Sequence, residues 1–198
     1  HADHIEATGD LREMFNCLVS GAAEDSARLP KLDEKLREND KFTLGDLNFS
    51  IMDVSGHTRG HIALYSSQLG AVFTADSLMT LGCGRLFEGT PKMMWYSLKK
   101  LCQLPSITSV FSGHDYTEKN SEFALSIDTK NTQLKKRTQF FEHIRSSGEP
   151  TVPSTIKDEL ETNIFLRSGN IEIKEALDMI DCSDETVFTE LRRRRDNF

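Results

Sequence analysis

The chain has 198 residues, of which 37% are hydrophobic and 28% are charged. This composition is ordinary for a globular protein with a substantial core, arranged as one large domain or as a domain and a half. A formal net charge of −7 argues against a general nucleic-acid binder, which needs a basic surface. The chain has no run of 18 apolar residues and no signal-peptide pattern at its start, so we expect neither a membrane partner nor a secreted protein.

Four cysteines are spread along the chain and form no C-x-x-C pair: Cys17, Cys83, Cys102 and Cys182. Their wide spacing predicts reduced thiols rather than a disulfide framework or a cysteine-based zinc site. We therefore expect a cytoplasmic protein.

The first four residues, His1-Ala2-Asp3-His4, hold two imidazoles and a carboxylate. Neither the helical period nor the strand period brings positions i, i+2 and i+3 to one face, so we expect a loop that wraps these side chains around a common point. Imidazole and carboxylate groups in that arrangement are typical of a metal site. Three further candidates occur in loop-like contexts rich in small residues, namely His57, Asp76 and His114.

The first half of the chain is predicted to alternate strands and turns. Residues 5–15 are expected to run from a loop into a short helix, and residues 18–21 to form a short strand. The segment 22–40 is expected to be a connection with one or two helical turns. Gly45-Asp46 separates two apolar runs, which predicts a tight hairpin. The strand that follows, residues 49–54, would end close to His57.

Residues 61–65 and 71–74 are predicted to form two more strands, the second ending next to Asp76. Pro91 begins a predicted helix, since a proline at the first helical position loses no hydrogen bond. A strand at 107–111 would then lead to His114. Three strands ending near three candidate ligands indicate a site built on loops that a rigid sheet holds.

Beyond residue 117 no further strand is predicted. Five helices are expected there: 120–126, 133–147, 154–161 with Ser154 as its cap, 170–181 and 186–195. We therefore divide the chain into a metal-binding domain, residues 1–117, and a helical substrate-binding domain, residues 118–198.

Taken in order, the motifs H-x-D-H, G-H-T-x-G, T-A-D-S and G-H-D-Y resemble the metallo-β-lactamase superfamily. Within it, the stretch 81–90 (LGCGRLFEGT) and the stretch 113–117 (GHDYT) resemble glyoxalase II, the hydroxyacylglutathione hydrolases. The resemblance implies an α+β fold, the metallo-β-lactamase αββα sandwich with a C-terminal helical domain. In that family the first metal loop is T-H-x-H-x-D-H. We therefore expect an N-terminally truncated form, in which one histidine ligand and the preceding strands are missing.

The resemblance also implies two divalent metal ions, expected to be zinc, with iron or manganese as alternatives. One ion would bind His1, His57 and the absent histidine, and the other would bind Asp3, His4 and His114, with Asp76 bridging the two. Asp3 is also the expected catalytic residue. The implied contacts with the glutathione moiety are Arg85, Phe87, Tyr116, Arg192 and Arg195. Phe87 stands where some members of the family have tyrosine. His61 and His143 match no ligand position.

The run of arginines at 192–195 has two other interpretations. Cations in the last turn of a helix stabilise its dipole, and a basic run is also typical of nucleic-acid or targeting patches. Arginine suits carboxylates because its fork binds two oxygens, and glutathione carries two carboxylates. The spacing of Arg192 and Arg195 places both on one helix face, so we favour glutathione binding.

The resemblance therefore implies a thioester hydrolase that cleaves S-D-lactoylglutathione, an S-2-hydroxyacylglutathione, to glutathione and D-lactate in methylglyoxal detoxification, and we expect it to be a monomer. Two alternatives stay open at this stage. One is a mononuclear-iron persulfide dioxygenase of the same superfamily, and the other is an inactive, truncated metal-binding fragment.

Overall fold

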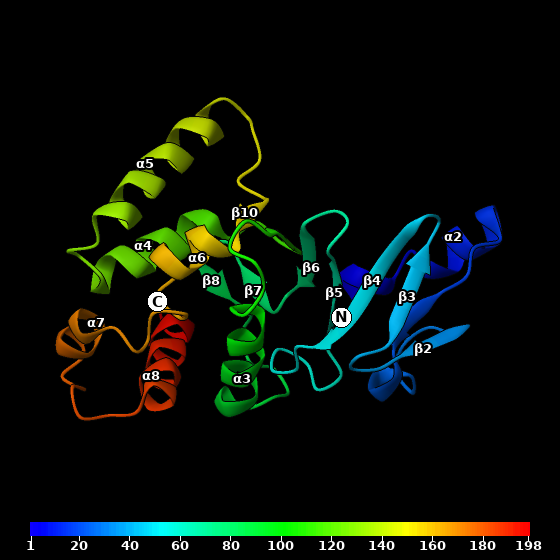
Figure 1. The fold of residues 1–198 in the computed structure, drawn as a ribbon, viewed down its shortest axis with the longest axis horizontal. Helices are drawn as coiled ribbons and strands as arrows, with labels where there is room; N and C mark the ends of the chain where they lie inside the picture. Colours follow the sequence, from blue (N-terminus) through cyan, green and yellow to red (C-terminus); the bar gives the residue numbers. More distant parts are fainter.

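The computed structural model describes residues 1–198 (Figure 1). The strands are β1 (Ser20–Ala22), β2 (Glu34–Leu36), β3 (Lys41–Leu44), β4 (Leu47–Asp53), β5 (Ile62–Ser66), β6 (Ala71–Ala75), β7 (Leu78–Met79), β8 (Gly82–Cys83), β9 (Ser109–Ser112) and β10 (Ser154–Thr155). The helices are α1 (Ala2–Ile5), α2 (Thr8–Phe15), the short 3-10 helix η1 (Ala23–Asp25), α3 (Pro91–Leu101), α4 (Thr117–Ile127), α5 (Thr132–Ser146), α6 (Ile156–Thr162), α7 (Ile171–Ala176) and α8 (Asp184–Asp196).

Six strands form the main sheet, in the order β10-β9-β6-β5-β4-β3. The pair β6–β9 is parallel and the other neighbours are antiparallel. It follows that β4, β6 and β9 run in the same direction, and their carboxyl ends meet at one edge of the sheet. Two small two-stranded sheets, β1–β2 and β7–β8, stand beside it.

One face of the main sheet packs against the helices. Ala63, Val72 and Val110 are buried on neighbouring strands, and they belong to the same hydrophobic cluster as Leu98 of α3 and Phe188 of α8. The alternation of side chains along each strand turns these residues to one side. Figure 1 shows α4, α5 and α6 on the β10 side of the sheet, and α2 on the far side, beyond β3.

The hairpin turn and the start of the helix at Pro91 have the predicted structure. The hairpin turn lies at Gly45-Asp46 between β3 and β4, with Gly45 at φ 58°, a conformation that glycine adopts without strain. Helix α3 begins with Pro91 at its first position, and the Thr90 hydroxyl caps it by accepting a hydrogen bond from the Met93 amide at 3.2 Å.

Other expectations are wrong. Residues 2–5 form a single helical turn instead of a loop. Helix α6 is capped by the Thr155 hydroxyl, which accepts from the Asp158 amide, instead of by Ser154. Ser154 lies in β10, a strand beyond residue 117 that was not predicted, and its partner is β9. The short strands β2, β7 and β8 were also missed, because two or three residues show no period.

The division at residue 117 stays a prediction. Strand β10 belongs to the second predicted domain but extends the main sheet of the first. One cluster of 23 buried hydrophobic residues spans both parts of the chain. None of the helices combines the length and the apolar character that crossing a membrane requires.

Candidate metal centre

Three of the predicted ligands follow strands whose carboxyl ends share one edge of the sheet. Asp76 comes directly after β6, His114 lies two residues beyond β9, and His57 lies four residues beyond β4. Loops at such an edge converge, because the strands that carry them run in parallel. The other three residues are Asp3 and His4 in the turn of α1 and His1, which directly precedes it, and they lie against these loops.

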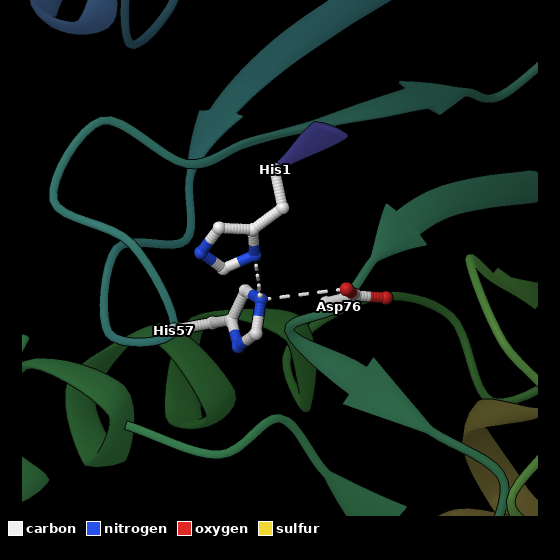
Figure 2. Close-up of side chains that lie close together, drawn as sticks. All are labelled: His1, His57 and Asp76. Atoms are coloured by element: carbon white, nitrogen blue, oxygen red, sulfur yellow. Dashed lines mark hydrogen bonds and ion pairs between the residues drawn. The ribbon is translucent and has the colours of Figure 1, made fainter. Parts of the chain in front are cut away.

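His1, His57 and Asp76 form a first ligand group (Figure 2). The Nε2 atom of His57 lies 3.1 Å from Nδ1 of His1 and 3.4 Å from Oδ2 of Asp76. The Nδ1 of His57 lies 2.7 Å from the carbonyl oxygen of Arg85. Because a carbonyl only accepts, Nδ1–H is the donor, and Nε2 is the ring nitrogen of His57 that is directed at the group.

Asp3, His4 and His114 form a second ligand group. The Nε2 of His114 lies 3.0 Å from Oδ2 of Asp3, and the Nε2 of His4 lies 3.6 Å from the same oxygen. Asp76 joins this group to the first, since its Oδ1 lies 2.8 Å from His114 Nδ1 and its Oδ2 lies 3.0 Å from His4 Nε2. The three polar residues of the segment 1–4 therefore do not share one point: His1 belongs to the first group, and Asp3 and His4 belong to the second.

The electrostatics of the two groups favour positive charge. Burial raises the pKa of the Asp76 carboxyl, but hydrogen bonds from His57, His114 and His4 outweigh burial and hold this pKa well below its usual range. Burial lowers the pKa of the His114 imidazole, but the carboxylates of Asp76 and Asp3 outweigh it and raise the pKa. The site thus keeps its carboxylate ionised and attracts cations.

Glycines bring the backbone close to Asp76. A Cβ atom on Gly84 would lie 1.9 Å from the carbonyl oxygen of Asp76, and a Cβ on Gly113 would lie 2.7 Å from its Oδ1. Neither position has room for a side chain. The backbone at Gly113 therefore lies against the Asp76 carboxylate, and the backbone at Gly84 lies against the main-chain carbonyl of the same residue.

The residues present fit divalent cations. The Nε2 of His57 and the Oδ2 of Asp76 face each other at 3.4 Å, and both atoms are of the kind that coordinates a cation held between them. Four imidazoles and two carboxylates supply the nitrogen and oxygen ligands that zinc and related ions bind. The His57–Arg85 hydrogen bond is also typical of metal sites, where the second ring nitrogen of a ligand donates to a carbonyl and fixes the ring. The hydrogen bonds among these side chains are those expected of a preassembled ligand shell.

A cavity of about 810 Å³ opens above the first ligand group and extends to helices α4 and α8. All five predicted substrate contacts line it: Arg85, Phe87, Tyr116, Arg192 and Arg195. Lys119, Asn120 and Asp196 also line it and were not predicted as site residues. Their only signal in the sequence is helical spacing, since Lys119 and Asn120 lie one turn beyond Tyr116, and Asp196 lies one turn beyond Arg192.

The arginines of α8 are held differently from each other. Arg192 is only 6% exposed, and its guanidinium donates to the carbonyl of Cys83 and to Asp196, both at 2.8 Å. Arg195 makes no ion pair, and its Nη2 donates to the Asn120 side chain at 3.3 Å. Arg192 therefore connects α8 to the loop at Cys83, whereas Arg195 is a cation facing the cavity.

Aromatic side chains line the cavity beside the ligands. The ring of Phe87 meets the rings of His1 and His57 edge-on, at centroid distances of 5.3 Å in both cases. Tyr116 stacks on His114 with centroids 5.3 Å apart. His61 packs beside His57 but belongs to neither ligand group.

Comparison with known proteins shows the family to which this chain belongs. The model described as "Hydroxyacylglutathione hydrolase C-terminus" matches residues 115–198. The hydroxyacylglutathione hydrolase of Roseobacter denitrificans is 50% identical over all 198 residues, which cover 78% of its length. The enzyme of the same name from Cereibacter sphaeroides strain ATCC 17025 is 48% identical with the same coverage. This chain belongs to the hydroxyacylglutathione hydrolase family. The family and the enzyme class predicted from the sequence, a thioester hydrolase, are confirmed.

Solved structures show the fold of this hydroxyacylglutathione hydrolase family member. ETHE1 from Myxococcus xanthus matches with a TM-score of 0.66 and 24% identity, over 98% of this chain and 64% of that one. The BLEG-1 B3 metallo-β-lactamase matches with a TM-score of 0.59 and 23% identity, over 84% of this chain and 73% of that one. The predicted metallo-β-lactamase fold is confirmed. TTHA1623, described in a di-iron-bound form, matches at 25% identity with a TM-score of 0.55, over 84% of this chain and 73% of that one.

Proposed function

We propose that this chain hydrolyses S-D-lactoylglutathione, an S-2-hydroxyacylglutathione, to glutathione and D-lactate, and so contributes to methylglyoxal detoxification. The observation that carries the proposal is the position of Asp76, which belongs to the first group of three ligands and contacts His4 and His114 of the second, at the base of a cavity lined by cations. The names of the relatives point to the same substrate class.

His1, His57 and Asp76 would hold the first ion and Asp3, His4 and His114 the second, with the Asp76 carboxylate near the ligands of both. When bound, two divalent ions supply a water of lowered pKa and stabilise negative charge on the carbonyl oxygen of the thioester. We propose zinc as the metal. Imidazole and carboxylate also accept iron and manganese, so elemental analysis of the purified protein decides between them.

The residues of the chain itself orient the site and transfer the proton. The Arg85 carbonyl fixes the His57 ring so that Nε2 faces the ligand group. We assign Asp3 the catalytic role: its Oδ2 is within 3.0 Å of His114, while its Oδ1 makes no hydrogen bond and is free to accept a proton from the attacking water. The reaction forms a C–O bond and breaks the C–S bond. Glutathione leaves as a thiolate, so no strong acid is required.

Arg85, Arg192 and Arg195 are proposed to attract the carboxylates of glutathione, and Phe87 and Tyr116 to pack against its backbone. Arg85 is well placed at the mouth of the cavity, because its side chain is 60% exposed and its guanidinium lies over the Phe87 ring at 5.7 Å. A planar guanidinium that stacks on a ring keeps its donors free for an incoming carboxylate.

The alternatives fit less well. A mononuclear-iron persulfide dioxygenase needs one ligand group, whereas this site has two, and Asp76 of the first contacts His4 and His114 of the second. An inactive fragment without metal does not require a carboxylate surrounded by three imidazoles, whereas a metal site does. We also propose a cytoplasmic location, supported by four free cysteines, and a monomer without nucleic-acid or membrane partners.

The rate of S-D-lactoylglutathione hydrolysis by the purified protein tests the proposal, with a chelator-treated sample and a zinc-reloaded sample as controls. We expect turnover that the chelator abolishes and zinc restores. Oxygen consumption with glutathione persulfide is measured on the same samples. Hydrolysis absent from a folded, metal-loaded sample would refute the proposal, and oxygen consumption there would establish the dioxygenase.

A further inference from the structure

Lys119 is a cation of the cavity that no part of the proposed machinery uses. It lies in the first turn of α4, three residues beyond Tyr116, and lines the same cavity as the ligand groups. Its neighbours Thr117 and Asn120 are buried, whereas Lys119 is exposed. The helix therefore anchors itself through one face and holds the lysine at the cavity wall.

The ammonium of Lys119 has no partner within the chain, since it makes neither a hydrogen bond nor an ion pair. The preceding residue, Glu118, does not neutralise it, because Glu118 pairs with Arg145 at 3.2 Å. The first turn of a helix also carries partial positive charge from its free amides. This wall of the cavity is therefore an unneutralised region of positive charge.

The other cations of the cavity differ in this respect. Arg192 pairs with Asp196 at 2.8 Å, and the Arg85 Nε lies 3.7 Å from the same carboxylate. Arg195 is the exception, and its guanidinium donates to Asn120, the residue next to Lys119. The cations are thus divided into two sets. Arg85 and Arg192 share one acid, whereas Lys119 and Arg195 flank Asn120 and have none.

We propose that Lys119 binds a carboxylate of the glutathione moiety and is a specificity-determining residue of this enzyme. Glutathione has two carboxylates, one on its glycine and one on its γ-glutamyl residue, and a cavity with two separate sets of cations suits an anion with two charged ends. A desolvated carboxylate gains most from cations that no acid of the protein already neutralises. The inference rests on the proposed glutathione thioesterase function.

The test uses the full chain, metal-loaded, with the Lys119→Met variant and a matched control, Lys135→Met. Lys135 is an exposed, unpaired lysine on α5 outside the cavity. Three substrates are compared: S-D-lactoylglutathione, its glycine carboxamide, and the analogue whose γ-glutamyl α-carboxylate is an amide. We expect Lys119→Met to raise KM for the parent substrate about tenfold, which corresponds to about 1.4 kcal/mol, while kcat changes less than about twofold. Lys135→Met should match the wild type.

The two amide analogues identify the partner. If Lys119 binds one carboxylate, the penalty of Lys119→Met disappears on the analogue that lacks this carboxylate and persists on the other, as a double-mutant cycle requires. An unchanged KM for the parent substrate, or an equal penalty on all three substrates, would overturn the inference.

Binding of glutathione, measured by calorimetry on the same proteins, separates this inference from the proposed function. A wild type that binds glutathione without hydrolysing the thioester would refute the function, and a weaker affinity of Lys119→Met for glutathione would still support the contact. A wild type that neither binds glutathione nor hydrolyses the thioester would overturn both.

Discussion

At the base of the cavity the ligand side chains are enclosed by backbone, whereas at its mouth the cations are carried by long side chains. Asp76 is 5% exposed and touches three imidazoles, and Gly84 and Gly113 leave no space beside it. Arg85 and Phe87 are both about 60% exposed. Side chains around a substitution at the base therefore cannot rearrange to accommodate it. Around a substitution at the mouth they can rotate into new positions.

This difference in rigidity supports the proposal that the base of the cavity holds the metal ions and that its mouth attracts the substrate. Holding cations close together needs fixed ligands, and a buried carboxylate held by three partners provides this. Attracting a charged substrate needs only charge and reach, which exposed cations provide. Variants at the base should abolish activity, and variants at the mouth should change KM while activity is retained.

The largest effect is expected from Asp76→Ala, because this carboxylate contacts both ligand groups. We expect the metal pair to be lost and kcat/KM to fall by about 10³-fold or more, the scale for losing electrostatic stabilisation of a transition state. Metal content by elemental analysis and hydrolysis rates check this. Asp115→Asn is the matched control, since this neighbour of His114 is exposed and belongs to neither group. An Asp76→Ala protein with two bound ions per chain would contradict the assignment.

The second prediction concerns Gly84→Ala, which adds one methyl group 1.9 Å from the Asp76 carbonyl oxygen. The backbone must move, so we expect destabilisation by about 1–3 kcal/mol together with weaker metal binding. The control is Gly9→Ala in α2, where a Cβ meets nothing within 4 Å, and a gain of about 0.5–1 kcal/mol is expected there. Denaturant unfolding of both variants gives the comparison. Gly84→Ala with wild-type stability and metal content would show that the base can relax.

The sequence predicts the base of the cavity better than its mouth. His57, Asp76 and His114 were identified from the sequence because each follows a strand, and strands of this length have a recognisable pattern. The six candidate ligands do gather around one carboxylate, although their roles stay predictions. The helical turn at residues 2–5 was missed, since the argument for a loop assumed that all three of its polar side chains share one point.

Lys119 and Asp196 were not identified for a different reason. An exposed lysine on a helix is common, and the residues of the chain do not reveal that this one faces a cavity until α4 and α8 are placed together. The cap of α6 could not be assigned from the local sequence, because Ser154 and Thr155 both carry a hydroxyl that can cap a helix. Both residues pair with β9, and α6 begins only at Ile156, which leaves Thr155 at the N-cap position. The pairing with β9 is a contact distant in sequence that no local pattern contains.

The third prediction compares the two arginines of α8 that face the cavity. Arg192→Met removes the donors of the Cys83 carbonyl and of Asp196, so we expect a loss of stability of about 1–3 kcal/mol in addition to a higher KM. Arg195→Met should leave stability within about 0.5 kcal/mol and raise KM alone. Unfolding curves and kinetics separate the two.

The substrate used for those kinetics sharpens the test. Both arginine variants should raise KM for S-D-lactoylglutathione far more than for a simple thioester without carboxylates. An equal rise on both substrates would contradict the proposed contact with glutathione, and would show that the arginines act through the shape of the cavity.

The smallest effect is expected from Phe87→Tyr. Phe87 keeps the ring contacts with His1 and His57 but has no hydroxyl to offer a substrate, and the added hydroxyl at this exposed position provides one hydrogen bond, worth about 0.5–1.5 kcal/mol. We expect KM to fall about threefold with kcat unchanged. Phe87→Ala is the companion variant, because it removes the ring and should loosen the first ligand group, lowering metal affinity as well. If Phe87→Tyr lowered metal affinity too, the ring would belong functionally to the rigid base of the cavity and not to its adaptable mouth.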